Sequence, residues 1–246
     1  ASSYLLQGLN VLYITLEMAE ERIAERIDAN LLDVTMEDLH DMPKQLYEGK
    51  ITKLREKTQG QLVIKEYPTA SAHSGHFKSL MNELALKKSF RPDVIFIDYL
   101  NICASSRFKG GNISSYFYVK AIAEELRGLA VEFNVPIFSA TQTTRTGYVS
   151  TDIGLEDTSE SFGLPATADF MFALISNEEL EALGQMKVKQ LKNRYNDPSI
   201  NRAFIIGVDR AKMRLYDVQQ KAGDIVDANQ VDEKEDAYNK FSDFKL

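Results

Sequence analysis

The hydrophobic positions of this chain alternate between short continuous runs and stretches in which apolar residues recur every three or four positions. Four of the continuous runs are rich in β-branched residues, as in parallel strands that are buried on both faces. These runs occupy residues 11–16, 62–64, 94–97 and 135–138. Because helical periodicity follows them, the pattern predicts an α/β fold with a mostly parallel, twisted sheet flanked by helices.

The segments between the runs carry the signals of helices. The strongest helical periodicity lies in residues 119–133, which place a broad apolar face toward the core. Thr35 and Asp38 have the spacing of a capping box, which predicts a short helix after residue 35. Ser74 is the expected cap of a helix that follows the second apolar run.

The pattern changes after residue 142. Residues 143–158 are polar and lack periodicity, so we expect a long loop there. Four further apolar runs follow, at residues 170–175, 186–191, 203–208 and 213–216. Their short connections predict antiparallel C-terminal hairpins, which we expect to extend one edge of the parallel sheet.

Composition narrows the class of protein. With 44% hydrophobic and 26% charged residues, the 246-residue chain can bury the core of one large α/β domain. No apolar run is long enough to span a bilayer and no export signal is evident, so we expect a soluble, cytoplasmic protein. The single cysteine, Cys103, suits a reducing compartment and follows an apolar strand, which indicates a buried small side chain. A net charge of −7 argues against a surface that coats nucleic acid throughout, but it permits local basic loops.

Polar residues follow three of the predicted strands at the edge where an open α/β sheet binds its ligands. These residues are Glu17, Asp98 and Gln142. A carboxylate at position 98 can hold the waters of Mg²⁺ beside nucleotide phosphates. The carboxylate of Glu17 can deprotonate an attacking water, and the amide of Gln142 can sense a phosphate.

Each of these three residues also has an ordinary explanation. Asp98 could simply start a turn, and Glu17 could be a first-turn acid favoured by the helix macrodipole. Gln142 could be one polar residue of a loop. The combination, with one such residue after each strand, is more informative than any of the three alone.

The surroundings of these residues resemble a known family. Residues 11–18, 94–100 and 139–145 resemble three successive motifs of DnaB-type replicative helicases. Lys192-Asn193-Arg194 looks like the K-x-R element of that family, and residues 166–170 match the stretch between the motifs. The resemblance covers residues 1–218 and is closest to the replicative helicases of T4-type phages.

The resemblance implies a RecA-like motor domain in a hexameric ring that hydrolyses ATP, or another NTP, at its subunit interfaces. It implies that Glu17 is the catalytic base, that Asp98 binds Mg²⁺ through water and that Gln142 is the γ-phosphate sensor. A neighbouring subunit would insert Lys192 and Arg194, because a planar guanidinium suits charge on a transferring phosphoryl group. The alternative for these two is a solvated strand edge, shared with other lysines of the same strand.

The family also threads single-stranded DNA past loops that face the channel of the ring. Six residues here fit that role by resemblance, namely Arg107, Lys109, Arg145, Tyr148, Glu160 and Ser161. Basic and aromatic side chains together suit backbone tracking with base stacking. One departure is clear, because Ser159 stands where the family has an arginine, so the arginine contact is lost, while main-chain N–H groups can still contact the DNA backbone. The alternative for all these loops is a solvated surface.

One motif is missing. The 246 residues contain no G-x-x-x-x-G-K-[ST] phosphate-binding loop. We interpret residues 1–218 as a motor domain without its first strand and phosphate-binding loop, truncated near its N-terminus. On its own the chain should therefore bind and hydrolyse ATP poorly. Residues 219–246 are acidic and are expected to form a flexible tail.

Partners and competing functions follow from the same resemblance. A replicative helicase of this type is expected to unwind DNA in the 5′→3′ direction, with a primase and a helicase loader as partners. Two alternatives stay open: a RecA-type recombinase ATPase, and a non-catalytic interaction module without a phosphate-binding loop. His73 and His76 could indicate a metal pair, but a helix-entry loop explains them without a metal.

Overall fold

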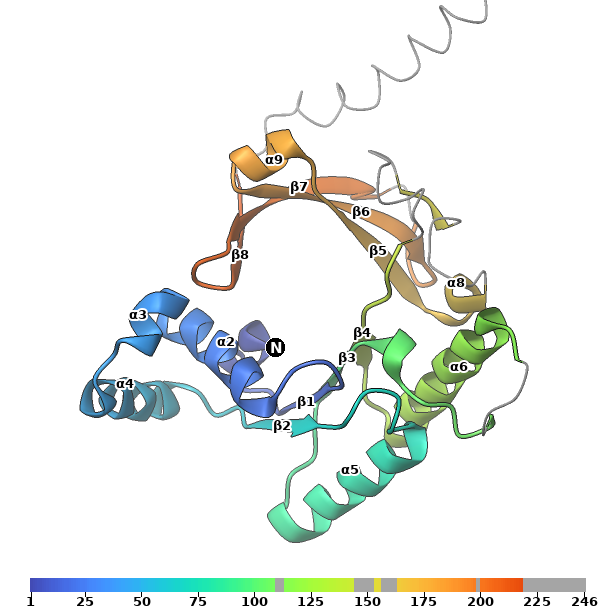
Figure 1. Cartoon of the computed structure of the whole chain (residues 1–246), viewed down its shortest axis with the longest axis horizontal. Helices are drawn as coiled ribbons and strands as arrows, with labels where there is room; N and C mark the ends of the chain where they lie inside the picture. The colour runs from blue at the N-terminus through green and yellow to red at the C-terminus, as the bar shows by residue number, and fades with distance from the viewer. Residues whose placement is uncertain (109–112, 144–152, 156–162, 198–199, 219–246) are drawn as a thin grey trace, which may run out of the picture.

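The computed structural model describes residues 1–108, 113–143, 153–155, 163–197 and 200–218. Within these residues the strands form two sheets of four strands each (Figure 1). The first sheet has the strand order β2-β1-β3-β4 and the second has the order β5-β6-β7-β8. The predicted α/β class is therefore confirmed.

The first sheet is parallel throughout. It contains β1 (Val11–Thr15), β2 (Leu62–Glu66), β3 (Val94–Asp98) and β4 (Ile137–Ser139). Thr15 pairs with Asp98, and Ile97 pairs with Ser139, so that β1, β3 and β4 end side by side. This register brings the segments after the three strands to one edge of the sheet.

Helices cover both faces of the parallel sheet. The helices before β4 are α1 (Ser2–Leu6), α2 (Glu20–Leu32), α3 (Met36–His40), α4 (Lys44–Lys57), α5 (Ser74–Lys88), the 3₁₀ helix η1 (Leu100–Ile102) and α6 (Ser115–Phe133). The larger hydrophobic cluster joins one sheet face to α5 and α6, and a smaller one joins the other face to α1 and α2. Helix α4 was not predicted, because it has no buried residue and so no apolar periodicity to detect.

Two helix starts test the capping predictions. The Thr35 side chain accepts a hydrogen bond from the Asp38 backbone N–H, which confirms the predicted cap of α3. The prediction for Ser74 is wrong, since His73 is the N-cap of α5 and accepts a hydrogen bond from the Gly75 N–H. His76 accepts a hydrogen bond from the His73 backbone N–H and completes a capping box. These bonds explain the histidine pair, and no metal-ligating cluster occurs among the described residues.

The second sheet is antiparallel, as the short connections predicted. It contains β5 (Phe170–Ile175), β6 (Gln185–Asn193), β7 (Ala203–Asp209) and β8 (Arg214–Asp217), with α8 (Gly163–Thr167) before β5 and α9 (Glu178–Ala182) after it. Among the described strands it is a separate sheet, and none of its strands pairs with the parallel one. Hairpin lengths determine how β5 to β8 pair with one another, but they carry no information on pairing with β4.

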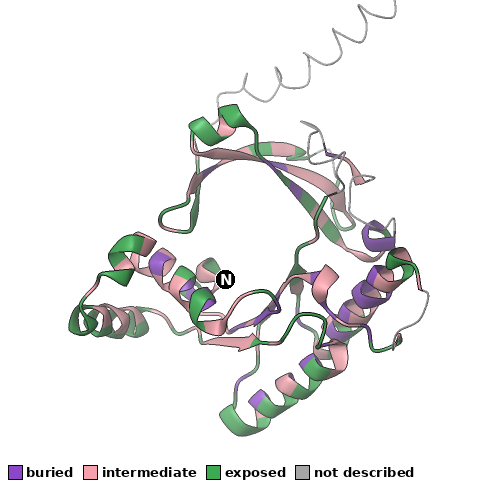
Figure 2. Ribbon diagram, viewed as in Figure 1, coloured by how far each residue is buried: buried purple, intermediate pink, exposed green. Residues whose placement is uncertain are grey.

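The two sheets differ in burial (Figure 2). The strands β1 and β3 are largely buried, and Cys103, which follows η1, is buried as predicted. The turn between β7 and β8 contacts the start of α3, where the Met36 N–H donates to the Ala211 carbonyl at 2.9 Å. Lys212 of this turn and Arg214 of β8 both pair with Asp33, the C-cap of α2, at 3.1 Å. Among the described helices, none has the length and apolar composition required to cross a bilayer.

Candidate functional site

The carboxyl ends of β1 and β3 are held together by backbone hydrogen bonds. The Leu16 N–H donates to the Asp98 carbonyl at 2.9 Å, directly beyond the Thr15–Asp98 pair of the ladder. The Leu100 N–H donates to the Ala140 carbonyl at 3.3 Å and ties the next segment to the end of β4. The predicted edge, with one polar residue after each of three neighbouring strands, is therefore formed.

Glu17 lies in a tight turn between β1 and α2. The buried Thr15 hydroxyl donates to the Met18 carbonyl at 2.8 Å and accepts from the Met18 N–H at 3.0 Å. This bridge spans Glu17 and leaves its side chain exposed. Helix α2 begins at Glu20, so the alternative that Glu17 is a first-turn helix acid is wrong. The turn presents a carboxylate at the sheet edge.

Asp98 is the last residue of β3 and has a partner that the sequence did not indicate. The Tyr13 hydroxyl on β1 donates a hydrogen bond to Asp98 Oδ2 at 3.0 Å. Burial, and then the charge of Asp98, raise the pKa of Tyr13 far above its usual range, so the hydroxyl remains a donor. Tyr99, rather than Asp98, caps the following 3₁₀ helix. The hydrogen bond from Tyr13 therefore orients the carboxylate of Asp98 at the end of β3.

Gln142 is connected to the same strand end through a tyrosine. Its Nε2 atom donates to the Tyr99 hydroxyl at 3.0 Å, next in sequence to Asp98. Beside it, the buried Thr141 Oγ1 has no hydrogen-bond partner among the described residues, and neither has the buried Asn101 Oδ1. Buried polar atoms are rarely left unpaired. Two such atoms beside Asp98 and Gln142 indicate a place that a polar ligand or its water would complete.

The donor set at this edge fits Mg²⁺ better than a metal that needs a protein cage. Across the described residues, no group of three or more histidines, cysteines or carboxylates gathers. Mg²⁺ commonly takes one or two carboxylates and fills its remaining positions with water and phosphate oxygens. The carboxylate of Asp98 at the end of β3 suits that mode.

Lys192 and Arg194 lie on the antiparallel sheet. Lys192 is in β6, which pairs with β5 on one side and with β7 on the other. The Lys192 ammonium donates to the carbonyl oxygens of Pro165 and Ala166 in α8. Burial, and then the neighbouring Arg194, lower the pKa of Lys192. The alternative of a solvated strand edge applies only in part. The register with β7 ends at Lys189, so Lys192 pairs with β5 alone, but its ammonium is bound to the carbonyl oxygens of α8.

Arg194 follows β6 directly and is bound to the start of β5. Its Nη1 atom pairs with Asp169 Oδ1 at 3.0 Å, and its Nη2 atom donates to the Ala166 carbonyl at 3.1 Å. Asp169 also pairs through Oδ2 with Arg127 of α6. The sequence did not mark Arg127 as a functional residue, because no motif surrounds it.

The structure thus brings the predicted residues together in two groups rather than one. Glu17, Asp98 and Gln142 form the strand-end group, and Lys192 and Arg194 form the cationic group. In the part of the chain that the structure describes, no hydrogen bond or ion pair joins the two groups. They also belong to different sheets (Figure 1).

Of the residues expected to contact DNA, only Arg107 is described. It follows η1 and forms an ion pair with Glu124 of α6. The loop before it is bound by Glu125, whose carboxylate accepts from the Ser105 hydroxyl at 2.6 Å and from the Ser106 N–H at 2.9 Å. The other expected residues lie outside the described part of the chain, namely Lys109, Arg145, Tyr148, Glu160 and Ser161.

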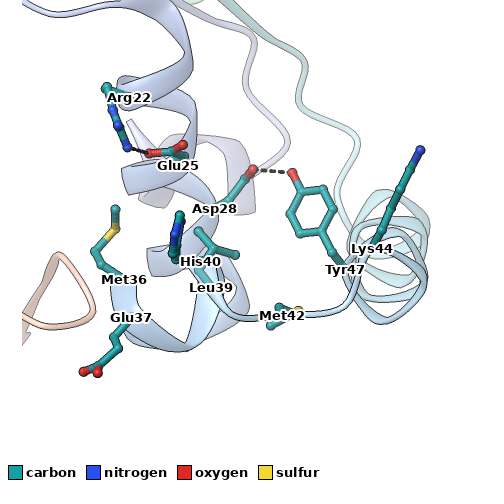
Figure 3. A pocket seen from close by; sticks show the side chains of 10 residues that line it. All are labelled: Arg22, Glu25, Asp28, Met36, Glu37, Leu39, His40, Met42, Lys44 and Tyr47. Carbon is teal, nitrogen blue, oxygen red and sulfur yellow. Dashed lines mark hydrogen bonds and ion pairs between the residues drawn. The ribbon is translucent and has the colours of Figure 1, made fainter.

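A pocket of about 620 Å³ lies among α2, α3 and α4 (Figure 3). Its wall includes the Asp28 carboxylate, which accepts a hydrogen bond from the Tyr47 hydroxyl at 2.6 Å. None of the predicted site residues lines this pocket. The strand-end group is instead an exposed edge, so the pocket is not the predicted site.

Known proteins match this chain over most of its length. Residues 1–214 match the DnaB-like helicase C-terminal domain family. Over 98% of its length, the chain is 44% identical to the DnaB-like replicative helicase of Enterobacteria phage T4 and covers 52% of that protein. A probable plasmid replicative DNA helicase of Chlamydia trachomatis is 34% identical over 56% of this chain, which covers 30% of it. The chain thus spans about half the length of its T4 relative.

Two solved structures share the fold. One is a DnaB-like replicative helicase studied together with its interactions with primase, with a TM-score of 0.70. The other is a separately solved ATPase domain, with a TM-score of 0.71. Each is 16% identical to this chain and matches 89% of it, which covers 53% of the first structure and 78% of the second. These likenesses confirm the expected RecA-like fold, and the match over residues 1–214 shows that the chain belongs to the DnaB-like replicative helicase family, as a C-terminal ATPase domain.

Proposed function

We propose that this chain is part of the nucleotide-hydrolysing motor of a hexameric replicative DNA helicase, with each active site shared by two subunits. The observation that carries the proposal is the separation of the strand-end group from the cationic group within one chain. In a ring of identical subunits, each head-to-tail interface joins one surface of a subunit to a different surface of its neighbour. Such an interface can bring the cationic group of one subunit against the strand-end group of the next.

In this proposal the strand-end group acts on the nucleotide and its attacking water. Glu17 accepts the proton of the water, and its exposed position beyond β1 supports this role. Asp98 holds Mg²⁺ through water, and the metal, when bound, neutralises charge on the phosphates. Gln142 binds the γ-phosphate region through its amide. Its bond to Tyr99 links that amide to the residue after Asp98.

The neighbouring subunit supplies Lys192 and Arg194. Their positive charges stabilise the negative charge that develops on the transferred phosphoryl group. Arg194 has five N–H donors, and its contacts with Asp169 and Ala166 use two of them, so others can bind phosphate oxygens. The surplus of positive charge around Asp169 supports the recruitment of a further anion.

The nucleotide is ATP or another NTP. The phosphate-binding loop of such enzymes is not among these 246 residues. Hydrolysis is therefore proposed for the complete helicase, meaning this chain together with the N-terminal region that carries the phosphate-binding loop. Residues 219–246 are proposed to act as an acidic, flexible tail.

We further propose that single-stranded DNA passes the loops that follow η1 and β4. Arg107 would release Glu124 and bind a DNA phosphate, together with Lys109, Arg145, Tyr148, Glu160 and Ser161. The expected direction is 5′→3′, and the expected partners are a primase and a helicase loader. The study of one structural relative with primase supports the first of these partners.

The test is DNA-stimulated ATP hydrolysis by the complete helicase and its Glu17→Gln and Arg194→Ala variants. We expect each substitution to lower turnover by on the order of a thousandfold, because general-base and arginine contributions are of that size. Nucleotide binding should survive Glu17→Gln. Glu21→Gln and Arg210→Ala are the matched controls, since both residues are exposed and belong to neither group. Turnover that is indifferent to both test substitutions would refute the proposal and favour a non-catalytic module.

A further inference from the structure

A cluster of three cations surrounds one carboxylate at the junction of α6, α8 and β6. Arg127, Lys192 and Arg194 supply the positive charges, and Asp169 supplies the negative one. The electrostatic influence of Arg194 and Arg127 on Lys192 lowers the pKa of its ammonium, in addition to the larger effect of burial. The three cations are thus close enough to repel one another, and Asp169 is the charge that holds two of them in place.

Asp169 binds its two arginines through different oxygen atoms. Oδ1 accepts from Arg194 at 3.0 Å, and Oδ2 accepts from Arg127. Arg127 also donates to the Thr167 carbonyl at 3.1 Å, two residues before Asp169. Because Arg127 belongs to the long helix α6, it braces the carboxylate from the side of the parallel sheet.

Backbone contacts fix the same geometry. The Arg194 N–H donates to the Asp169 carbonyl at 2.9 Å, so both the main chain and the side chain of Arg194 are set by one residue. The Ala166 carbonyl accepts from the second guanidinium nitrogen at 3.1 Å. A guanidinium held at both of its terminal nitrogens has a defined plane, which a flexible surface arginine lacks.

The exposure of the cluster indicates that its ion pairs orient Arg194 rather than stabilise the fold. The side chains of Arg127, Asp169 and Arg194 are 38%, 33% and 43% exposed, respectively. Ion pairs with this exposure contribute little to folding, because water screens them and ordering the side chains costs entropy. Their fixed geometry is more valuable for placing a group that must act at a particular point.

We propose that Asp169, braced by Arg127, is the positioning residue for Arg194. The inference rests on the proposed function, in which Arg194 acts on the nucleotide of a neighbouring subunit. Asp169 touches neither nucleotide nor DNA in this account. It holds the guanidinium in the plane and place that the neighbouring site requires, and Arg127 prevents the carboxylate from turning away.

The test is a double-mutant cycle in the complete helicase with Asp169→Asn and Arg194→Ala, read as DNA-stimulated turnover and as the KM for ATP. The asparagine keeps the shape of Asp169 but removes its charge. We expect kcat to fall by roughly ten- to a hundredfold, as for other misplaced catalytic groups, while the KM changes little. In the Arg194→Ala background, Asp169→Asn should have no further effect, because its target is gone.

Two further variants separate this role from a purely structural one. Arg127→Gln should lower kcat in the same direction as Asp169→Asn and lose its effect in the Arg194→Ala background. Glu181→Gln removes the charge of a different ion pair, which joins Glu181 of α9 to Arg210 after β7 at 3.0 Å, and should leave turnover unchanged. If Asp169→Asn fails to assemble, Arg127→Gln carries the same test.

The outcomes distinguish the positioning role from the proposed function. If Arg194→Ala lowers turnover but Asp169→Asn and Arg127→Gln do not, the positioning role is wrong and the shared site survives. Equal losses from Asp169→Asn with and without Arg194 would show a structural contribution and overturn the inference. If Arg194→Ala itself has no effect, the shared active site is the part that fails.

Discussion

The parallel and the antiparallel sheet of this molecule are held in different ways. In the parallel sheet, the central strands β1 and β3 are almost completely buried between helices. In the antiparallel sheet, β5 alternates, and Phe170, Phe172 and Leu174 are about half exposed. The strand-end group lies on the first sheet and the cationic group on the second. The strand-end group, whose members act together in one subunit, therefore lies on the more buried sheet. The cationic group, which is proposed to act on a neighbouring subunit, lies on the more exposed sheet.

Core substitutions test this difference most strongly. Ile95 is completely buried in β3, whereas Phe172 in β5 is 45% exposed. We expect Ile95→Ala to lower the free energy of unfolding by about 2–5 kcal/mol, because it leaves a cavity in a packed core. Phe172→Ala should cost less than about 1 kcal/mol, because much of its ring is already in water. Urea unfolding of this chain measures both.

Similar losses of unfolding free energy from Ile95→Ala and Phe172→Ala would contradict the difference between the two sheets. A loss of several kcal/mol from Phe172→Ala would mean that the exposed face of β5 is covered in solution, by a second copy or by another segment. If a second copy covers this face, the loss of unfolding free energy from Phe172→Ala should depend on protein concentration. The loss from Ile95→Ala should not depend on protein concentration.

A smaller effect concerns the loop that leaves the parallel sheet before Arg107. Burial raises the pKa of Glu125, but hydrogen bonds from Ser105, Ser106 and Ser74 outweigh it, so the pKa is lowered overall. A carboxylate with a lowered pKa stabilises the fold above its ordinary pKa of 4.5, and this contribution disappears as the pH falls through the folded value. We therefore expect Glu125→Gln to cost no more than about 1 kcal/mol at pH 7.

The pH profile is what distinguishes this interaction. The difference in stability between the wild type and Glu125→Gln should narrow as the pH is lowered from about 5 to about 3, where the carboxylate protonates. Glu56→Gln, on the exposed surface of α4, is the control and should show no such narrowing. A pH-independent difference would mean that shape, and not charge, holds this loop.

The sequence indicated the strand-end group because Glu17 and Asp98 directly follow apolar runs and Gln142 lies four residues beyond one. A buried parallel strand ends at the edge of the sheet where ligands bind, so a polar residue at its end is expected at that edge. Asp98, after the apolar residues 94–97, is an example. The fold class followed from the same runs. Helix α4 could not be predicted, since none of its residues is buried.

The cationic group was predicted only by resemblance, and its support was not predicted at all. Arg127 and Asp169 are 42 positions apart in the sequence, and they meet because α8 packs against α6 before β5 begins. No local pattern marks such a pair. The same holds for Tyr13, which reaches Asp98 only because β1 and β3 are neighbours in register.

The most direct test of a site shared by two subunits is to mix subunits that carry Glu17→Gln with subunits that carry Arg194→Ala. Each variant alone should give almost no phosphate in a single-turnover measurement with the complete helicase. Random mixing in equal amounts restores both groups at about a quarter of the interfaces, because the intact Glu17 and the intact Arg194 then come from different subunits. An active site shared by two subunits predicts a burst of phosphate from the mixture that is far above the sum of the bursts from the two variants. A mixture no more active than that sum would contradict it, since a site contained within one chain cannot be rescued by a neighbour.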